Sequence, residues 1–414
     1  MASMPTTTDE DTVESAAPEP AAHVPAFPPD FGSRVTIDLG AIAANWRILD
    51  SRATPVECAA VVKADAYGCG LEPVTRVLTA AGCRTFFVAD LAEARRVRAI
   101  APEAAIYVLN GLLPGTPPDF AEIYARPVIG SLVELAEWDT FCNARDWHGG
   151  AALHVDTGMN RLGINPQEAA ALAPRVTQSE RHGISLLMSH LACADVPEHP
   201  LNDRQIRIFR EVRTHFRGVP ASLANSPGIF LDDACHCDMV RPGVALYGAN
   251  PTPYRSNPMR PVVGLSARIL QIRSVPRGEA VGYGAAWTAQ RITRLAVVAA
   301  GSADGYSRAV GSTDGQAGAE AVVAGVRCPV VGRVSMDLLA VDITDLPEHT
   351  AHRGDLVTLI GSALTLDEVA AVAGLIPYEL LTGLGRSHTR VHIEPSADEQ
   401  ALAPAPRGRR GRRG

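Results

Sequence analysis

The chain has 414 residues, more than one hydrophobic core ordinarily holds, so its length alone predicts two domains. Hydrophobic residues make up 46% and charged residues 20%, and the net charge of −7 argues against a general nucleic-acid-binding surface. The eight cysteines follow no disulfide framework, and Cys235-His236-Cys237 has no second Cys/His pair at ligand spacing, so we expect reduced thiols and no metal.

The two ends of the chain differ in composition from the rest. Residues 1–33 carry acidic side chains among Ala, Pro and Thr, with no Lys or Arg, which predicts a disordered arm. Residues 397–414 end in an Arg-Gly repeat, which predicts a basic disordered tail. The sequence shows neither an apolar stretch of about 20 residues nor a signal peptide, so we expect a cytoplasmic protein with no membrane partner.

From residue 34 onward, short apolar runs alternate with segments of helical periodicity. The apolar runs lie at residues 35–39, 59–63, 85–90, 105–110, 127–130, 151–156, 184–190 and 221–225. The helical segments include residues 71–81, 91–100, 132–144, 166–176 and 202–216. This alternation favours an α/β fold in which residues 34–260 form a (β/α)8 TIM-like barrel. A doubly wound open sheet is the alternative, but no Gly-rich dinucleotide fingerprint follows the first run.

After about residue 260 the spacing of the apolar runs changes. Strand-like runs with short Gly/Pro turns between them lie at residues 265–275, 295–300, 321–326, 330–334, 338–343 and 356–360. One helical pattern follows at residues 366–373. We therefore predict that residues 261–396 form a C-terminal, mostly-β domain.

Lys63 closes the apolar run at residues 59–63 and precedes a turn that contains Tyr67. A lysine at the end of a buried strand is costly unless it pairs or reacts. At the C-terminal end of a barrel strand it points to the place where barrel enzymes build their active sites. A desolvated lysine loses proton affinity and can form a Schiff base with an aldehyde.

Other polar residues fall at the C-terminal ends of later runs, so we expect them on the same rim of the barrel. They are His154 and Asp156, Ser189 and His190, Asn225 and Ser226, and then Arg241. Ser226 and the amides near Gly243 and Val244 are suited to cradle a phosphate. A reactive lysine, a phosphate cradle and a histidine that faces a ring together indicate pyridoxal 5'-phosphate as the cofactor.

The segment Val-Val-Lys-Ala-Asp-Ala-Tyr-Gly at residues 61–68 resembles the cofactor-lysine signature of alanine racemases, the fold-type III pyridoxal enzymes. Further matching motifs lie in family order at residues 155–163, 188–192, 224–226, 240–248, 282–284, 303–306, 332–337 and 377–379. The resemblance thus covers about residues 34–393. It implies an isomerase of D-alanine biosynthesis that interconverts L- and D-alanine and works as a homodimer with shared active sites.

The resemblance also implies a role for each matching residue. Lys63 would hold the cofactor and act as one acid/base group, and Tyr283 from the partner subunit would be the other. The expected cofactor-binding residues are Lys63, Tyr67, His190, Asn225, Ser226, Arg241, Gly243, Val244 and Tyr378. The substrate carboxylate would be held by Arg161 and by the amide of Met336 from the partner chain.

These implied roles agree with the chemistry of racemisation. Two groups on opposite faces of a planar carbanion can remove a proton and deliver another better than one group can. A phenol such as Tyr283, with a reference pKa near ~10, needs nearby cations to act as a base at neutral pH. Arg241 would leave the pyridine nitrogen unprotonated, because a guanidinium cannot accept a proton. The resulting weaker electron sink limits side reactions, which suits a racemase.

Two positions depart from the family pattern. His154 stands where the family usually has a carbamylated lysine, so we expect Arg161 to be oriented by a bound anion such as chloride or by neutral His154 itself. With a reference pKa near ~6.5 for His154, substrate affinity should then weaken below about pH 6. Ser302 replaces the usual aromatic residue at the entrance to the site and would leave more room there.

Three other functions remain as alternatives. The first is a racemase of the same mechanism that acts on serine or another small amino acid in a specialised pathway. The second is a decarboxylase, which would normally want an acid in place of Arg241. The third is a non-catalytic pyridoxal carrier, which would resemble the barrel alone and would not need Tyr283.

Overall fold

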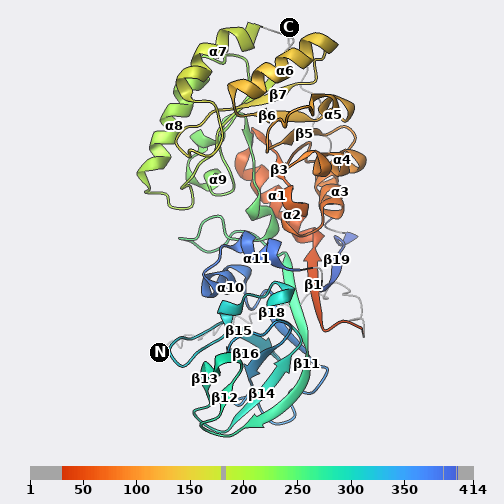
Figure 1. Ribbon diagram of the computed structural model, residues 1–414, viewed down its shortest axis with the longest axis vertical. Helices are drawn as coiled ribbons and strands as arrows, with labels where there is room; N and C mark the ends of the chain where they lie inside the picture. The colour runs from red at the N-terminus through yellow and green to blue at the C-terminus, as the bar shows by residue number, and fades with distance from the viewer. Residues whose placement is uncertain (1–29, 179–182, 386, 398, 400–414) are drawn as a thin grey trace, which may run out of the picture.

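The structure, a computed structural model, describes residues 30–178, 183–385, 387–397 and 399. Most of the predicted arm at residues 1–33 and nearly all of the predicted tail at residues 397–414 lie outside the described residues. The described chain has two parts, a helix-covered barrel at one end of the long axis and a mostly-β domain at the other (Figure 1). Among the described helices, none is long and apolar enough to cross a membrane.

Parallel strands form the barrel, as predicted. Seven of them lie in one sheet, in chain order: β3 (Ala60–Val61), β4 (Thr85–Val88), β5 (Ala105–Val108), β6 (Arg126–Ile129), β7 (Ala151–His154), β8 (Ile184–Met188) and β9 (Ala221–Ser222). The barrel closes through β10 (Met239–Val240), which pairs in parallel with β2 (Glu57–Cys58), directly before β3. Asp238 donates its backbone N–H to Ala221 O at 2.9 Å, so β10 also lies beside β9.

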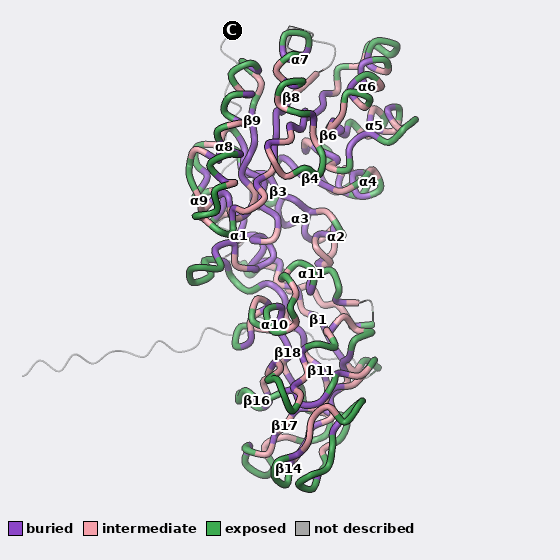
Figure 2. The backbone as a smooth tube through the Cα atoms, turned by 60° about the vertical axis from the view of Figure 1, so that its left-hand side comes forward, coloured by how far each residue is buried: buried purple, intermediate pink, exposed green. Residues whose placement is uncertain are grey.

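Helices cover the outside of the barrel, as expected for strand–helix alternation. They are α1 (Leu39–Ala53), α3 (Leu71–Ala81), α4 (Leu91–Ile100), α5 (Pro117–Glu122), α6 (Leu132–Arg145), α7 (Pro166–Gln178), α8 (Pro200–Arg213) and α9 (Gly228–Leu231). In α3, for example, Leu71, Val74 and Leu78 recur at helical spacing and are fully buried. Figure 2 shows buried residues along the barrel strands and exposed residues on the outer faces of the helices.

An eight-stranded sheet forms the second domain. Its strands follow the order β14 (Thr293–Val298), β17 (Leu339–Asp342), β16 (Val326–Val331), β15 (Glu320–Val323), β18 (Leu356–Ile360), β11 (Val263–Val275), β1 (Ser33–Asp38) and β19 (Thr389–Ile393). The long β11 also pairs with β14, so the sheet curls back on itself. A small hairpin, β12 (Ala280–Val281) and β13 (Trp287–Thr288), and the helices α10 (Leu366–Ala373) and α11 (Pro377–Gly383) complete the domain.

Two predicted strands need correction. The run at residues 35–39 is wrong as a barrel strand, because β1 pairs with β11 and β19 of the β domain. The eighth barrel strand is instead β10, whose two apolar residues stand between Asp238 and Arg241 and so form no recognisable apolar run. The run at residues 321–326 crosses a tight turn, since Ala324 and Gly325 have φ values of 48° and 83° and separate β15 from β16.

Candidate active site

Lys63 is the first residue of α2 (Lys63–Tyr67), which is a single left-handed turn. Ala64, Asp65, Ala66 and Tyr67 have φ values of 54° or 55°, a conformation that L-residues rarely adopt. Such backbone strain persists only where the surrounding structure holds it in place. The turn therefore needs partners from outside its own segment.

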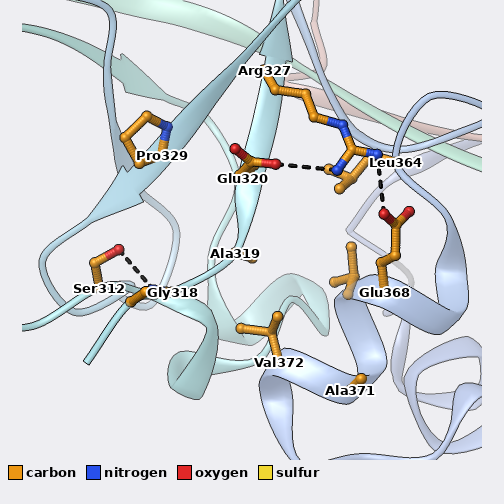
Figure 3. A pocket seen from close by; sticks show the side chains of 12 residues that line it. Ser312, Gly318, Ala319, Glu320, Arg327, Pro329, Leu364, Glu368, Ala371 and Val372 are labelled. Atoms are coloured by element: carbon orange, nitrogen blue, oxygen red, sulfur yellow. Dashed lines mark hydrogen bonds and ion pairs between the residues drawn. The ribbon is translucent and has the colours of Figure 1, made fainter.

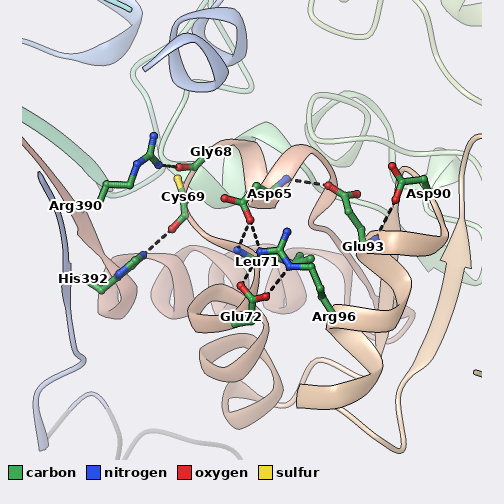
Figure 4. A network of polar contacts seen from close by, with 10 residues as sticks. All are labelled: Asp65, Gly68, Cys69, Leu71, Glu72, Asp90, Glu93, Arg96, Arg390 and His392. Atoms are coloured by element: carbon green, nitrogen blue, oxygen red, sulfur yellow. Dashed lines mark hydrogen bonds and ion pairs between the residues drawn. The ribbon is translucent and has the colours of Figure 1, made fainter. Parts of the chain in front are cut away.

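Helix α4 supplies one set of partners for this turn (Figure 4). Glu93 accepts the backbone N–H of Asp65 at 2.9 Å. The Asp65 carboxylate accepts the N–H of Leu71 at 3.1 Å and a guanidinium N–H of Arg96 at 2.6 Å. The left-handed turn after Lys63 is thus tied to the helix of the next strand–helix unit.

Strand β19 of the β domain supplies the second set (Figure 4). The Arg390 guanidinium donates to Gly68 O and also to Leu384 O at 2.7 Å. His392 Nε2 donates to Cys69 O at 2.8 Å. The two domains therefore hold the turn after Lys63 between them.

Lys63 is half-buried, and it is the only lysine among the 38 Lys and Arg residues of the chain. Burial lowers the pKa of its ammonium group, and the charge of Arg161 lowers that pKa further, whereas Glu93 opposes the shift. That Lys63 is unique was missed from the sequence, where a count of lysines apart from arginines shows it. No other side chain can form a Schiff base through an amine.

A compact cradle lies beside Lys63. Ser226 Oγ accepts the N–H groups of Gly243 at 2.9 Å and Ala245 at 3.3 Å, at the start of the 3-10 helix η2 (Val244–Tyr247). A Cβ on Gly243 would lie 2.4 Å from the Tyr67 hydroxyl, so any larger residue there would force the phenol to move. The Tyr67 phenol, the Ser226 hydroxyl and the amides around Gly243 thus meet at one place and suit the phosphate of a cofactor.

Two further aromatic residues border this cradle. The Tyr67 ring stacks on Tyr247, with ring centroids 4.6 Å apart. Tyr378 lies in the first turn of α11 and is 46% exposed. Burial raises the pKa of the Tyr67 phenol, and the nearby Tyr378 phenol raises it further. The structure thus brings the predicted residue Tyr378, from the β domain, to the same place as Tyr67.

Arg241 follows β10 and is buried, with 3% of its surface exposed. Its guanidinium donates to Ser222 Oγ, to Ser189 O at 2.6 Å and to His190 Nδ1 at 3.5 Å. Burial lowers the pKa of Arg241 to about 10, so the guanidinium stays charged at neutral pH. Burial and this charge hold the pKa of His190 well below its usual value, so that ring is neutral.

Gln205, on the buried face of α8, joins the loops that carry these groups. Its Nε2 donates to Thr157 Oγ1 at 3.1 Å and to His190 O at 2.8 Å, and its Oε1 accepts the Ala192 N–H at 2.9 Å. Gln205 was missed from the sequence. The sequence does offer a signal, because Gln205 is an uncharged polar residue next to Ile206 on the apolar face of the helix. A buried amide usually has hydrogen-bond partners, so such a residue indicates a structural contact.

Arg161 and His154 lie on the same rim. Asp156 Oδ1 accepts the N–H groups of Gly158 at 2.9 Å and Met159 at 3.0 Å, which shapes the loop that presents the exposed Arg161. His154, at the end of β7, is 8% exposed. Among the described residues, no hydrogen bond joins the His154 ring to Arg161.

The expectation that His154 titrates near pH 6 is wrong for this site. Burial lowers the pKa of His154 to about 4, and the charges of Arg241 and Arg161 act in the same direction. The imidazole is therefore neutral at physiological pH. Substrate affinity should not depend on its protonation until the pH approaches 4.

Tyr283 and Met336 both belong to the β domain. Tyr283 begins η3 (Tyr283–Ala285) directly after β12, which lies at the far end of the β domain from the barrel (Figure 1). Tyr283 is 63% exposed and Met336 is 71% exposed. The Arg308 guanidinium lies 6.0 Å from the centroid of the Tyr283 ring and supplies a cation beside the phenol.

A cavity of about 500 Å³ opens elsewhere in the β domain, between β15, β16 and α10 (Figure 3). Arg327 bonds Glu320 at 3.1 Å and Glu368 at 3.0 Å on its wall, so these charges are already paired. None of the predicted site residues lines this cavity.

Family models match both domains. The alanine racemase N-terminal domain matches residues 37–251, and the alanine racemase C-terminal domain matches residues 262–392. The chain belongs to the alanine racemase family. It is 54% identical over 366 residues to the alanine racemase of Methylobacterium nodulans, a match that covers 88% of this chain and 97% of that one. It is 46% identical to the alanine racemase of Rhizobium meliloti, with coverage of 88% and 98%.

Solved structures agree with this assignment. The alanine racemase of Bartonella henselae with covalently bound pyridoxal phosphate superposes with a TM-score of 0.82 at 37% identity, covering 87% of this chain and 99% of that one. The alanine racemase of a D-cycloserine-producing Streptomyces lavendulae gives a TM-score of 0.82 at 30% identity, covering 89% and 99%. The predictions of a pyridoxal-phosphate enzyme of this family and of its fold are confirmed.

Proposed function

We propose that this alanine racemase interconverts L- and D-alanine with two acid/base groups, Lys63 and Tyr283 of the partner subunit. The observation that carries the proposal is Lys63, the one lysine of the chain, held at the barrel rim with its pKa lowered by burial. One group takes the proton from Cα, and the other delivers a proton to the opposite face, so the product differs only in configuration.

Pyridoxal phosphate, when bound, supplies the electron sink that makes the Cα proton removable. Lys63 would hold the cofactor covalently, and Tyr67, Ser226, Gly243, Val244 and Tyr378 would surround its phosphate. The cradle supports this role, because its hydroxyls and amides converge where a Cβ on Gly243 would collide with the Tyr67 hydroxyl.

Arg241 and His190 would bind the pyridine ring side of the cofactor, and Asn225 would be a further cofactor-binding residue. The Arg241 guanidinium stays charged and cannot accept a proton, so it would leave the ring nitrogen unprotonated. A neutral nitrogen makes the ring a weaker electron sink. This limits side reactions and suits an enzyme that only moves protons.

Arg161 would hold the substrate carboxylate together with the backbone amide of Met336 from the partner subunit. Arg161 is exposed at the rim and its charge acts on Lys63, which supports this role. Arginine suits this role, because its planar donors match a carboxylate.

The proposal includes a homodimer in which each site takes residues from both subunits. Tyr283 and Met336 are exposed on the single chain, and Tyr283 follows β12, at the end of the β domain away from the barrel, so we infer that one chain alone holds an incomplete site. It also includes a cytoplasmic location, which the eight free cysteines support, since thiols stay reduced there.

A racemase for serine or another small amino acid is a second candidate. Ser302 is exposed and donates its N–H to Ser335 O at 2.9 Å, so a small side chain stands next to Met336. Incubating the purified protein with single L-amino acids and separating the products by chirality tests both candidates. We expect D-alanine from the parent and none from Lys63→Ala, and a faster reaction with L-serine would favour the second candidate.

A further inference from the structure

Glu93 makes an unusual pair of hydrogen bonds. It is the third residue of α4, whose N-cap Asp90 accepts the Glu93 N–H at 3.0 Å. A glutamate at this position ordinarily bonds back to the N-cap amide. Here one carboxylate oxygen accepts the N–H of Ala89 at 2.8 Å, and the other accepts the N–H of Asp65 at 2.9 Å. The carboxylate thus joins the end of β4 to the strained turn after Lys63.

Glu134 makes the same arrangement at another strand. It is the third residue of α6, and its oxygens accept the N–H of Gly130 at 2.8 Å and the N–H of Leu112 at 2.9 Å. In both cases the acid ties the end of its own strand to the loop after the preceding strand. The loop held by Glu134 carries no lysine, so Glu134 provides a matched internal control.

Glu93 also acts on Lys63 through its charge. Arg161 and His190 face the lysine from the loops after β7 and β8. Glu93 faces it from α4, is 9% exposed, and raises the pKa of Lys63 against the effect of burial.

The other charged groups near the turn form ion pairs with one another. Arg96 bonds the carboxylates of Asp65 and Glu72, both at 2.6 Å. Tyr247, from η2, faces both Glu93 and Asp65, and its pKa is raised mainly by burial. Glu93 is therefore the acid whose charge opposes the effects of burial and Arg161 on Lys63.

We propose that Glu93 is a positioning residue for Lys63, holding the left-handed turn through the Asp65 amide and placing a negative charge beside the lysine. Its consequence for catalysis rests on the proposed role of Lys63 as the cofactor lysine. The contact itself does not depend on that role, because it is made within the polypeptide.

The test uses the full-length apoprotein, in which Lys63 is the only side-chain amine. We would label the protein with trinitrobenzenesulfonate across a range of pH and follow the Lys63 peptide by mass, apart from the α-amino group. Glu93→Gln should lower the midpoint of Lys63 labelling by about half a pH unit, or raise the rate below the midpoint about threefold. Glu134→Gln, which removes the same charge from the same geometry, should leave the midpoint unchanged.

Equal midpoints in the parent and Glu93→Gln would overturn the proposal. An upward shift would also overturn it, because it would mean that the acid only shields Lys63 from water. Glu93→Asp covers the case in which Glu93→Gln does not fold. It keeps the charge but is too short to reach both amides, so the labelling midpoint should hold while uptake of pyridoxal phosphate by the apoprotein slows about tenfold.

Unchanged uptake in Glu93→Asp would contradict the positioning role. The labelling experiment needs neither cofactor nor turnover. Its failure would therefore leave the proposed catalytic function intact, and that function is tested separately by racemisation assays.

Discussion

The Tyr67 hydroxyl lies 2.4 Å from the position that a Cβ on Gly243 would occupy. Gly243→Ala should therefore displace the phenol from the phosphate cradle, and we expect affinity for pyridoxal phosphate to fall by at least about tenfold. Gly315→Ala is the control, because a Cβ there meets nothing within 4 Å. Cofactor titration of the two apoproteins measures the difference, and equal affinities would show that the approach of Tyr67 to Gly243 does not form the cradle.

Borohydride reduction should attach the cofactor covalently to Lys63 alone. The purified protein should be yellow, and borohydride should abolish this visible absorption while fixing the cofactor covalently. Because the chain has one lysine, the only competing amine is the terminal α-amino group. Peptide mass mapping that finds the reduced adduct at the N-terminus, or no adduct at all, would refute the assignment of Lys63.

Gln205→Leu should destabilise the protein. The substitution leaves the Ala192 N–H and the His190 carbonyl without their buried partner, and it should lower the free energy of unfolding by about 3 kcal/mol. Gln290→Leu, at an exposed position, should change it by less than about 0.5 kcal/mol. Urea unfolding compares the variants, and a neutral effect of Gln205→Leu would mean that the loops hold each other without this amide.

His154 should make the protein less stable in acid. Its pKa is about 4 when folded and near ~6.5 when unfolded, so the unfolded chain binds the proton first as the pH falls. The loss begins near pH 6.5, is complete near pH 4 and reaches about 3 kcal/mol. His154→Leu should flatten the pH dependence of unfolding by that amount, whereas identical slopes would place the histidine in a more polar environment.

His154 also leads us to expect that the activity does not depend on bicarbonate. A neutral imidazole at position 154 does not form the stable carbamate that a lysine would, so activity should not respond to added bicarbonate. His154→Lys tests whether the position controls Arg161. If neither the parent nor the variant responds, position 154 does not orient Arg161 through a carbamate.

The sequence predicted the barrel and the β domain because buried strands and amphipathic helices have distinct apolar periods. It could not assign the run at residues 35–39 to its sheet, because an apolar strand reads alike in either domain until its partners β11 and β19 are known. The two-residue β10 is defined by hydrogen bonds alone. The local sequence pattern therefore predicts which segments are strands and which are helices. Long-range pairing decides to which sheet each strand belongs.

The candidate site shows the same division. Lys63 and Arg241 could be found because charged residues at the ends of buried strands are conspicuous. The left-handed turn after Lys63 could not be found, since Ala64 and Ala66 give no local reason for a positive φ. The contacts of Glu93 and Gln205 were also hidden, because their partners are backbone groups of distant loops.

A mixing experiment tests the central claim, that each site combines Lys63 of one subunit with Tyr283 of its partner. Lys63→Ala and Tyr283→Phe should each be inactive as homodimers, since positioned acid/base groups contribute about 10²–10⁴-fold. Random subunit exchange should restore about a quarter of the parent activity, because half of the dimers then carry one intact site. Mixing Lys63→Ala with Arg161→Ala should restore none, since those residues belong to the same barrel. No recovery in the first mixture, with exchange verified, would contradict the shared two-base site.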